Sequence, residues 1–334
     1  MQKINRMDLL NKLQFLTPGL SDKEIVEQST CFVFRKGKIL TYNDELLCQT
    51  SCDLGFEGAI KASTFLNTIR KEDCKSFALE HKKGKIVLKT RGMKYSLFLE
   101  KEITLPVEQV SVPEKWKKLP VNFVEGLSTV YPIASSDDSL FVLTCVLFSP
   151  THLEVTDRWQ ACRYAVTLPI KKPFLVRKKA IQYLSERNIV KFAIDDAWIH
   201  FQSELGIISC RRYVDTKDFQ DTEDYVSGKG VRFKLPVDIT GKIEKLNTYL
   251  KDNVGKASLR VELKSGAYKI VSKGINGVAI AAGKTLYTGK PVSFMVYADT
   301  LLYLCSHYRN CFIAKDKILV SGKNFQYAAA MKMI

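Results

Sequence analysis

The ten residues IKASTFLNTI (60–69) return as LVRKKAIQYL (175–184) and again as MVYADTLLYL (295–304). Apolar residues occupy matching places in the three segments. A phenylalanine follows each segment at the same distance, and these are Phe77, Phe192 and Phe312. The offsets are 115 residues (192 minus 77) and 120 residues (312 minus 192). Because self-similarity at a nearly fixed period marks a repeated structural unit, we predict three copies of a short helix followed by a strand pair.

A second repeated element lies upstream of each helix. Phe34, Phe148 and Leu263 occupy equivalent strand-like positions, and a tight turn follows each of them. Nine positions further on, the equivalent residues are Asn43, Asp157 and Ser272. Turn residues flanked by period-two alternation of apolar and polar residues predict β-hairpins.

A third repeated element opens the later copies. The segments KLPVNF (118–123) and KLPVDI (234–239) match at an offset of 116 residues (234 minus 118). Asn122 and Asp238 are good helix N-caps, because a short side-chain acceptor can satisfy a free backbone N–H of the first turn. Asp8 occupies the corresponding place near the start of the chain. We therefore predict helices over residues 8–16, 122–131 and 238–250.

These elements together predict an α+β fold made of three tandem helix/β-hairpin domains, over residues 1–112, 113–228 and 229–334. Each copy has an ordinary domain length. If the copies pack side by side, their sheets form an outer wall and their helices line the inner face. Such a curved array closes when two chains meet head to tail, so we expect one chain to form half of a closed ring.

The net charge of +16 favours a polyanionic partner, with nucleic acid first. An anionic membrane would call for a basic amphipathic helix or a lipidation motif, and the sequence has neither. No segment is long and apolar enough to span a bilayer, and the N-terminal residues lack the apolar run of a signal peptide. We expect a cytoplasmic protein that has no membrane partner.

Five short segments resemble a known family. The best match is LEVTDRWQAC (153–162) followed by LPI (168–170) and FLVRK (174–178), where the family has a Thr-Asp-Gly-His-Arg-Leu type segment. Thr156 and Asp157 match this pattern, and residues 158–161 depart from it. Phe219-Gln220-Asp221 is similar to a family Phe-Pro-Asp segment, and AAAMKMI (328–334) to a Met-Pro-Met tail, each with the proline replaced. In this order on a threefold repeat, they make the chain resemble the bacterial-type DNA polymerase III beta subunit, the sliding clamp, as a divergent or phage-like member.

The resemblance implies a homodimeric ring that encircles duplex DNA without reading its sequence and tethers a DNA polymerase. It also implies a separate ATP-dependent clamp loader, and a chain that is not an enzyme and carries no cofactor or metal. The helices would face DNA with the residues Lys12, Lys61, Arg70, Lys71, Arg177, Lys178, Lys179, Arg187, Lys242, Lys245 and Lys251. Their attraction to phosphates would be sensitive to salt. The alternative for each single residue is a solvated surface charge.

The resemblance also implies a partner-peptide pocket between the second and third domains and a dimer seam between the first and third. The pocket residues carried over by position are Thr156, Trp159, Ala161, Ala329, Met331 and Met333. Flexible thioethers suit a surface that accepts several linear motifs. The seam residues are Tyr249 and Leu250. The alternatives are a core position for Trp159, end packing for the terminal methionines, and ordinary core packing for the seam residues.

Signals for catalysis are weak. Gly283-Lys284-Thr285 lacks the first glycine and the following helix of a phosphate-binding loop. The four histidines are far apart, and Asp195-Asp196 falls in a predicted hairpin turn, where aspartate is expected for backbone reasons. A metal-dependent nuclease is therefore disfavoured. A single-stranded nucleic-acid-binding protein built from tandem β-rich modules remains as an alternative, although its stacking aromatics would have to come from the phenylalanines at core-like repeat positions.

Overall fold

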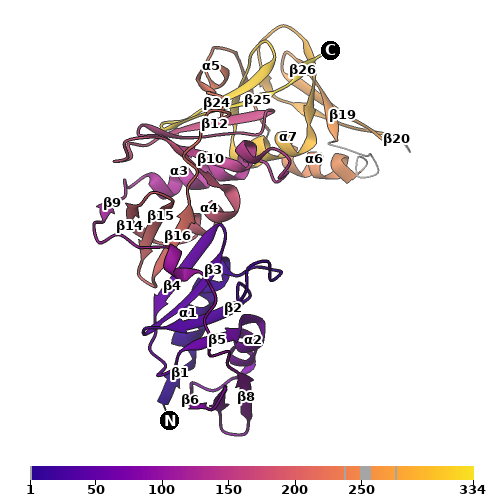
Figure 1. Ribbon diagram of the computed structural model, residues 1–334. Coiled ribbons are helices and arrows are strands. Elements are labelled where there is room, and N and C mark those ends of the chain that lie inside the picture. Colours follow the sequence, from indigo (N-terminus) through magenta and orange to yellow (C-terminus); the bar gives the residue numbers. More distant parts are fainter. Residues whose placement is uncertain (1, 237, 249–256, 275–276) are drawn as a thin grey trace. The chain divides into compact units, whose positions relative to one another are not determined.

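The computed structural model describes residues 2–236, 238–248, 257–274 and 277–334. Within these ranges one order of elements occurs three times: a short strand, a helix, four strands, a second helix and three strands (Figure 1). The triplication predicted from the sequence is confirmed. The offsets between copies therefore reflect equivalent places in three similar structures.

The first copy consists of β1 (Gln2–Asn5), α1 (Arg6–Leu16), β2 (Cys31–Arg35), β3 (Lys38–Asn43), β4 (Leu46–Ser51), β5 (Gly58–Lys61), α2 (Ala62–Lys71), β6 (Ser76–Lys82), β7 (Lys85–Lys89) and β8 (Lys94–Phe98). The second consists of β9 (Lys117–Lys118), α3 (Phe123–Val130), β10 (Cys145–Phe148), β11 (His152–Thr156), β12 (Gln160–Ala165), β13 (Phe174–Arg177), α4 (Lys178–Ser185), β14 (Ile189–Ile194), β15 (Trp198–Ser203) and β16 (Ile207–Arg211). The short helix α5 (Glu223–Val226) follows it.

The third copy consists of β17 (Val231–Lys234), α6 (Ile239–Thr248), β18 (Ser258–Lys264), β19 (Ala267–Gly274), β20 (Gly277–Lys284), β22 (Val292–Tyr297), α7 (Ala298–His307), β23 (Asn310–Ile313), β24 (Lys317–Ser321) and β25 (Phe325–Ala330). Two short strands, β21 (Leu286–Tyr287) and β26 (Lys332–Met333), are additions of this copy.

The chain divides into two compact units, and unit 1 comprises Met1–Ser128 and Leu168–Thr216. One of its sheets has the strand order β1-β6-β7-β8, and the other has the order β5-β2-β3-β4-β16-β15-β14-β9. The second sheet joins the first and second copies, because β4 pairs antiparallel with β16, with Leu46 opposite Cys210. Buried side chains of both helices of the first copy, such as Leu13 and Phe65, belong to the core of this unit.

Unit 2 comprises Thr129–Thr167 and Lys217–Ile334 and repeats this arrangement. In one sheet the strands of this unit run β10-β11-β12-β25-β24-β23-β17-β21, and the other sheet runs β20-β19-β18-β22-β26. Here β12 pairs antiparallel with β25, with Gln160 opposite Ala329, so this joint is equivalent to the joint in unit 1. Both compact units contain strands of the second copy, so they do not follow the predicted boundaries at 112/113 and 228/229, which remain a prediction.

Several predicted helix limits are wrong. Helix α1 begins at Arg6, and its N-cap is Asn5, whose side chain accepts a hydrogen bond of 3.0 Å from the backbone N–H of Asp8. Asp8 therefore lies inside the first turn. The second helix of each copy starts two or three residues later than predicted, because Ile60, Leu175 and Met295 belong to the strands that precede the helices. Among the described residues, no helix combines the length and apolarity needed to cross a membrane.

Candidate functional site

Ten of the eleven residues predicted to face DNA lie in or beside helices of the described chain; Lys251 lies outside the described residues. Arg70 and Lys71 occupy the last turn of α2, and Lys61 precedes its first residue. Lys178 and Lys179 begin α4, and Lys245 lies in the last turn of α6. A positive charge near a helix C-terminus interacts favourably with the helix dipole, so Arg70, Lys71 and Lys245 also stabilise their own helices.

Some of these charges already have partners. Lys12 forms an ion pair of 3.0 Å with Asp8, and Lys242 one of 2.7 Å with Asp238, both one helical turn away. The carboxylates of these pairs are 61% and 64% exposed, and pairs that water reaches are weak. Lys242 also donates to the Tyr268 hydroxyl at 3.0 Å and to the Ala282 carbonyl oxygen at 3.3 Å. Arg177 differs in its partner, because both side chains of the pair are largely buried, at 17% and 22% exposed, and its guanidinium donates to the Glu45 carboxylate at 3.1 Å. We therefore expect Arg177 to order unit 1 rather than to attract DNA.

The predicted pocket residues lie at one end of the joint between β12 and β25 in unit 2. Ala161 stands opposite Ala328, and Gln160 stands opposite Ala329. Because successive residues of a strand point to opposite faces, Ala161 and Ala329 lie on opposite faces of the sheet. Ala328, rather than Ala329, therefore shares the face of Ala161, and the pocket residues carried over by position remain a prediction.

Trp159 is the most exposed aromatic residue of this region. Its side chain is 44% exposed, and its ring meets the ring of Tyr297 edge-on at 5.1 Å. Its backbone oxygen accepts a hydrogen bond of 2.7 Å from the N–H of Ala330. An exposed position excludes the alternative of a core residue. Thr156, by contrast, is buried and donates its hydroxyl hydrogen to the Gln160 carbonyl oxygen at 2.9 Å.

The chain end packs against the same region. Met331 is buried, and its N–H donates to the carbonyl oxygen of Asp316 at 2.9 Å. Met333 is largely exposed and lies in β26, opposite Phe294 of β22. The proposed seam residues Tyr249 and Leu250 lie outside the described residues.

Helix α5 supplies two residues that the sequence reasoning missed. Val226 is buried in a cluster with Ala161, Leu319 and Ala328, and Tyr225 packs against this cluster. Lys317 holds the C-terminal end of α5, because its ammonium donates to the carbonyl oxygens of Asp224, Tyr225 and Ser227 at 3.1, 2.7 and 3.1 Å. The proximity of α5 to Phe219-Gln220-Asp221, the segment that carried part of the resemblance, is the signal that could have identified them.

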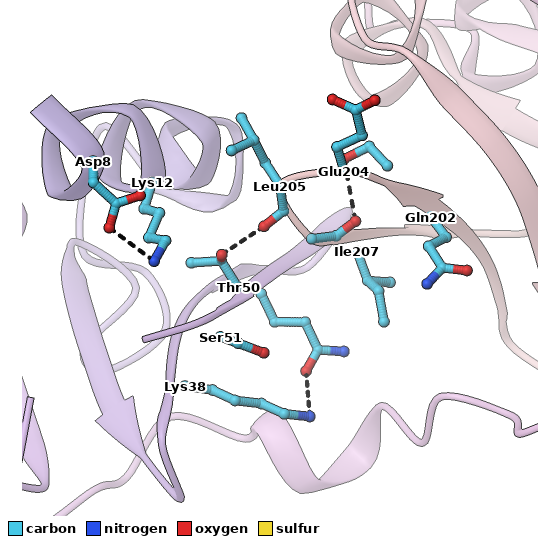
Figure 2. Close-up of a pocket in the computed structure, with 12 residues that line it drawn as sticks. Asp8, Lys12, Lys38, Thr50, Ser51, Gln202, Glu204, Leu205 and Ile207 are labelled. Carbon is cyan, nitrogen blue, oxygen red and sulfur yellow. Dashed lines mark hydrogen bonds and ion pairs between the residues drawn. The ribbon is translucent and has the colours of Figure 1, made fainter. Parts of the chain in front are cut away.

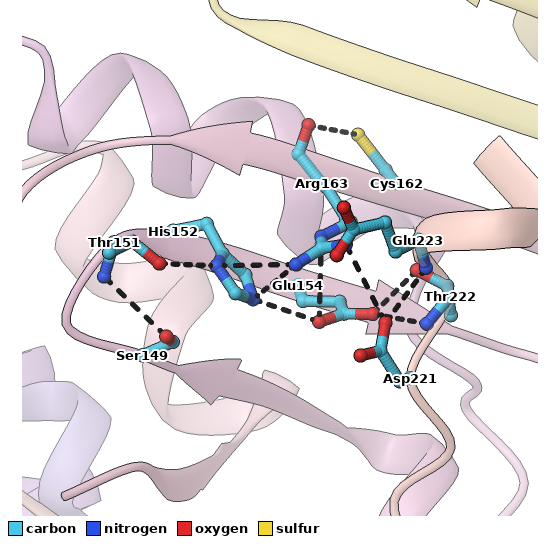
Figure 3. Close-up of polar contacts among 9 residues, drawn as sticks. All are labelled: Ser149, Thr151, His152, Glu154, Cys162, Arg163, Asp221, Thr222 and Glu223. Atoms are coloured by element: carbon cyan, nitrogen blue, oxygen red, sulfur yellow. Dashed lines mark hydrogen bonds and ion pairs between the residues drawn. The ribbon is translucent and has the colours of Figure 1, made fainter. Parts of the chain in front are cut away.

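A buried carboxylate fastens the start of α5 to the sheet (Figure 3). One oxygen of Glu154 accepts the N–H and the hydroxyl of Thr222, both at 2.6 Å, and the other contacts His152 at 3.0 Å. Arg163 lies 3.8 Å from the same carboxylate and 2.8 Å from Glu223. Burial would raise the pKa of Glu154, but the bonds from His152 and Thr222 and the charge of Arg163 outweigh burial and lower it. The carboxylate therefore stays ionised and holds α5 in place.

A polar cleft of about 450 Å³ lies in unit 1 beside the joint of β4 and β16 (Figure 2). It is lined by Lys12, Lys38, Gln49 and Glu204, among others. A cleft in unit 2 is lined by His152 and Arg163, which stand 114 residues beyond Lys38 and Gln49 (152 minus 38, 163 minus 49). Because the two clefts are equivalent under the repeat, we attribute them to the shape of the joint.

The residues considered above as signals for catalysis have structural roles. Asp195 closes the predicted hairpin turn, since its carboxylate accepts the N–H groups of Ala197 and Trp198 at 2.8 and 2.7 Å. The same side chain and Ser209 flank the ring of His200 at 3.1 and 2.8 Å. His200 and Ser209 are fully buried, and burial lowers the pKa of His200. A substrate has no access to this Ser-His-Asp array. Gly283-Lys284-Thr285 lies at the end of β20 and no helix follows it.

Comparison with known proteins gives one consistent result. No family model and no curated protein matches the sequence. Solved structures do match: the DNA polymerase III beta subunit of Thermotoga maritima has a TM-score of 0.83 at 11% identity, with 99% of both chains covered. The sliding clamp of Bartonella birtlesii has a TM-score of 0.84 at 13% identity, again with 99% of both chains covered. The DNA polymerase III beta chain of Streptococcus pneumoniae has a TM-score of 0.82 at 15% identity over 98% of both chains. Over nearly its whole length, the chain therefore has the fold of the DNA polymerase III beta subunit, the sliding clamp.

Proposed function

We propose that this protein is a DNA sliding clamp, a processivity factor that encircles duplex DNA and tethers the replicative polymerase. The observation that carries the proposal is the likeness of fold to sliding clamps over 98–99% of the chain. It is supported by the net charge of +16 and by the basic residues on the helices of each copy. Contact with phosphates rather than bases suits a protein that slides.

The pattern of strand pairing supports closure of the ring by a second chain. In both internal joints, the fourth strand of one copy pairs with the last strand of the next copy, as β4 does with β16 and β12 with β25. Among the described strands, the two counterparts β20 and β8 each have one neighbour, β19 and β7. An open strand edge is a template for pairing with another chain. Pairing β20 of one chain with β8 of another would continue the pattern and close a ring of two chains.

The tether would be a linear peptide of the polymerase, bound at the end of sheet joint β12–β25 near Trp159 and α5. Exposed apolar side chains such as Trp159 and Met333 fit a docking surface for such a peptide. In this proposal the chain carries no catalytic group or cofactor, works in the cytoplasm and relies on a separate ATP-dependent loader. The alternative of tandem single-strand-binding modules is disfavoured, because four of the five repeated phenylalanines, Phe34, Phe77, Phe148 and Phe192, are buried and offer no ring to a base. The fifth, Phe312, is partly buried and packs against the apolar cluster of Ala161 and Leu319.

The oligomeric state tests the proposed ring. Native mass spectrometry at micromolar concentration should give a particle of twice the chain mass of 37.9 kDa. A ring of two identical chains would contain the β8–β20 contact twice. A particle of one chain mass at all concentrations up to that range would contradict ring closure by two chains.

A further inference from the structure

The ring of Tyr225 occupies a place that a ligand side chain would fit. It packs over an apolar floor that contains two alanines, Ala161 and Ala328, together with Leu319 and Val226. Small floor residues leave room above them, and Tyr225 fills that room from α5. The ring itself is only partly buried. The ammonium of Lys317 lies 5.3 Å from the centre of the ring.

This position of the ring is unfavourable for the hydroxyl of Tyr225. It is buried and has no hydrogen-bond partner among the described residues. Burial, followed by the charges of Asp316 and Asp157, raises the pKa of Tyr225 to about 12, so the hydroxyl keeps its hydrogen at neutral pH. A buried donor without an acceptor is unfavourable relative to a hydrated one. The packed position of the ring is thus less stable than its apolar contacts alone would make it.

Hydrogen bonds and packing hold the backbone on both sides of Tyr225, so the group that can move is its side chain. Glu154 holds Thr222, Lys317 holds the carbonyl oxygens of Asp224, Tyr225 and Ser227, and Val226 is buried. Rotation about the side-chain bonds would carry the ring into solvent, where water satisfies the hydroxyl. This rotation would uncover the alanine floor beside Trp159 without unfolding α5.

We propose that Tyr225 is a displaceable plug of the peptide-docking surface, and that an apolar side chain of the partner peptide replaces its ring over Ala161 and Ala328. This inference rests on the proposed function. Peptide binding then includes the expulsion of the ring, and the measured affinity is reduced by the fraction of molecules in which the plug is closed. Because the unpaired hydroxyl destabilises the closed position, a fraction of the molecules keeps the ring in the open position.

The plug predicts opposite effects for two substitutions. Tyr225→Phe removes the unsatisfied hydroxyl, stabilises the closed ring and should weaken peptide binding by about 5-fold. Tyr225→Ala removes the plug and should tighten binding by about 10-fold. The probe is a fluorescein-labelled 12-residue peptide, the tightest one selected from a phage library on the wild-type protein, and its affinity is measured by fluorescence anisotropy. Thermal melting of each variant checks that the fold is retained.

A Trp159→Ala variant tests the docking surface separately from the Tyr225 plug. A selected peptide that binds Trp159→Ala at least 10-fold more weakly reports on this surface. If such a peptide binds Tyr225→Ala more weakly than wild type, Tyr225 is a wall of the site, and the plug is overturned while the docking surface stands. If none of the selected peptides responds to Trp159→Ala, the docking surface is overturned and the plug with it.

Discussion

Replacing Ile280 with aspartate should convert the protein from a dimer into a monomer. Ile280 lies in β20, whose only neighbour among the described strands is β19, and its side chain is 59% exposed. In the proposed dimer, β8 of a second chain would cover this side chain, and a carboxylate there would have to lose its water without gaining a partner. We expect the dimer dissociation constant to rise by about 100-fold or more, measured by analytical ultracentrifugation across a concentration series.

The matched control is Ile25→Asp. Ile25 is 85% exposed and lies outside the strands of unit 1, so the same chemical change at this position should leave the dimer intact. Each variant should keep the thermal melting of the wild-type chain, because neither isoleucine is part of the core. A dimer of unchanged strength in Ile280→Asp would show that β20 is not the contact between chains.

Replacing Glu154 with glutamine should loosen α5. The substitution removes the charge that faces His152 and Arg163 and weakens the two short bonds from Thr222. Losing one partner of a buried, hydrogen-bonded charge pair costs about 3 kcal/mol. Amide exchange of residues 222–226 should therefore become about 100-fold faster at neutral pH, as measured by hydrogen–deuterium exchange.

The effect should depend on pH in a defined direction. The pKa of Glu154 is lowered in the folded protein, so its stabilising contribution is complete above the ordinary carboxyl pKa and is lost as pH falls through the lowered value. Wild type and Glu154→Gln should thus converge in acid. The control is Glu223→Gln, which removes an exposed partner of Arg163 and should change exchange little. Equal exchange in Glu154→Gln and Glu223→Gln at neutral pH would refute the role of the buried carboxylate.

The sequence predicted the triplicated fold because apolar residues that are buried in the structure recur at equivalent positions of the three copies. Leu66, Ile181 and Leu301 recur at equivalent places, and the structure packs them in equivalent helices. Helix starts were predicted less well, since an apolar residue such as Leu175 suits a buried strand as well as a helix. The cap of α1 was misplaced because Asn5 and Asp8 are both good N-cap residues and only the backbone decides between them.

Only part of the candidate site could be predicted, because tertiary structure brings its other residues together. Position along the chain brought Trp159 and Ala161 together, but the register of β12 against β25 joins residues that lie far apart in sequence. That register decides that Ala328, not Ala329, shares the face of Ala161. The bond between Glu154 and Thr222 and the packing of Tyr225 likewise depend on tertiary structure. A local pattern carries no information on such contacts, so the roles of these residues became visible only in the fold.

In the proposed function, the protein holds DNA by topology. Its most direct test compares residence times of the loaded, fluorescently labelled protein on nicked circular duplex and on linear duplex of equal length, at a salt concentration that suppresses phosphate contacts. A closed ring should remain on the circle and slide off the ends of the linear molecule. Equal residence times on the two DNAs would contradict encirclement.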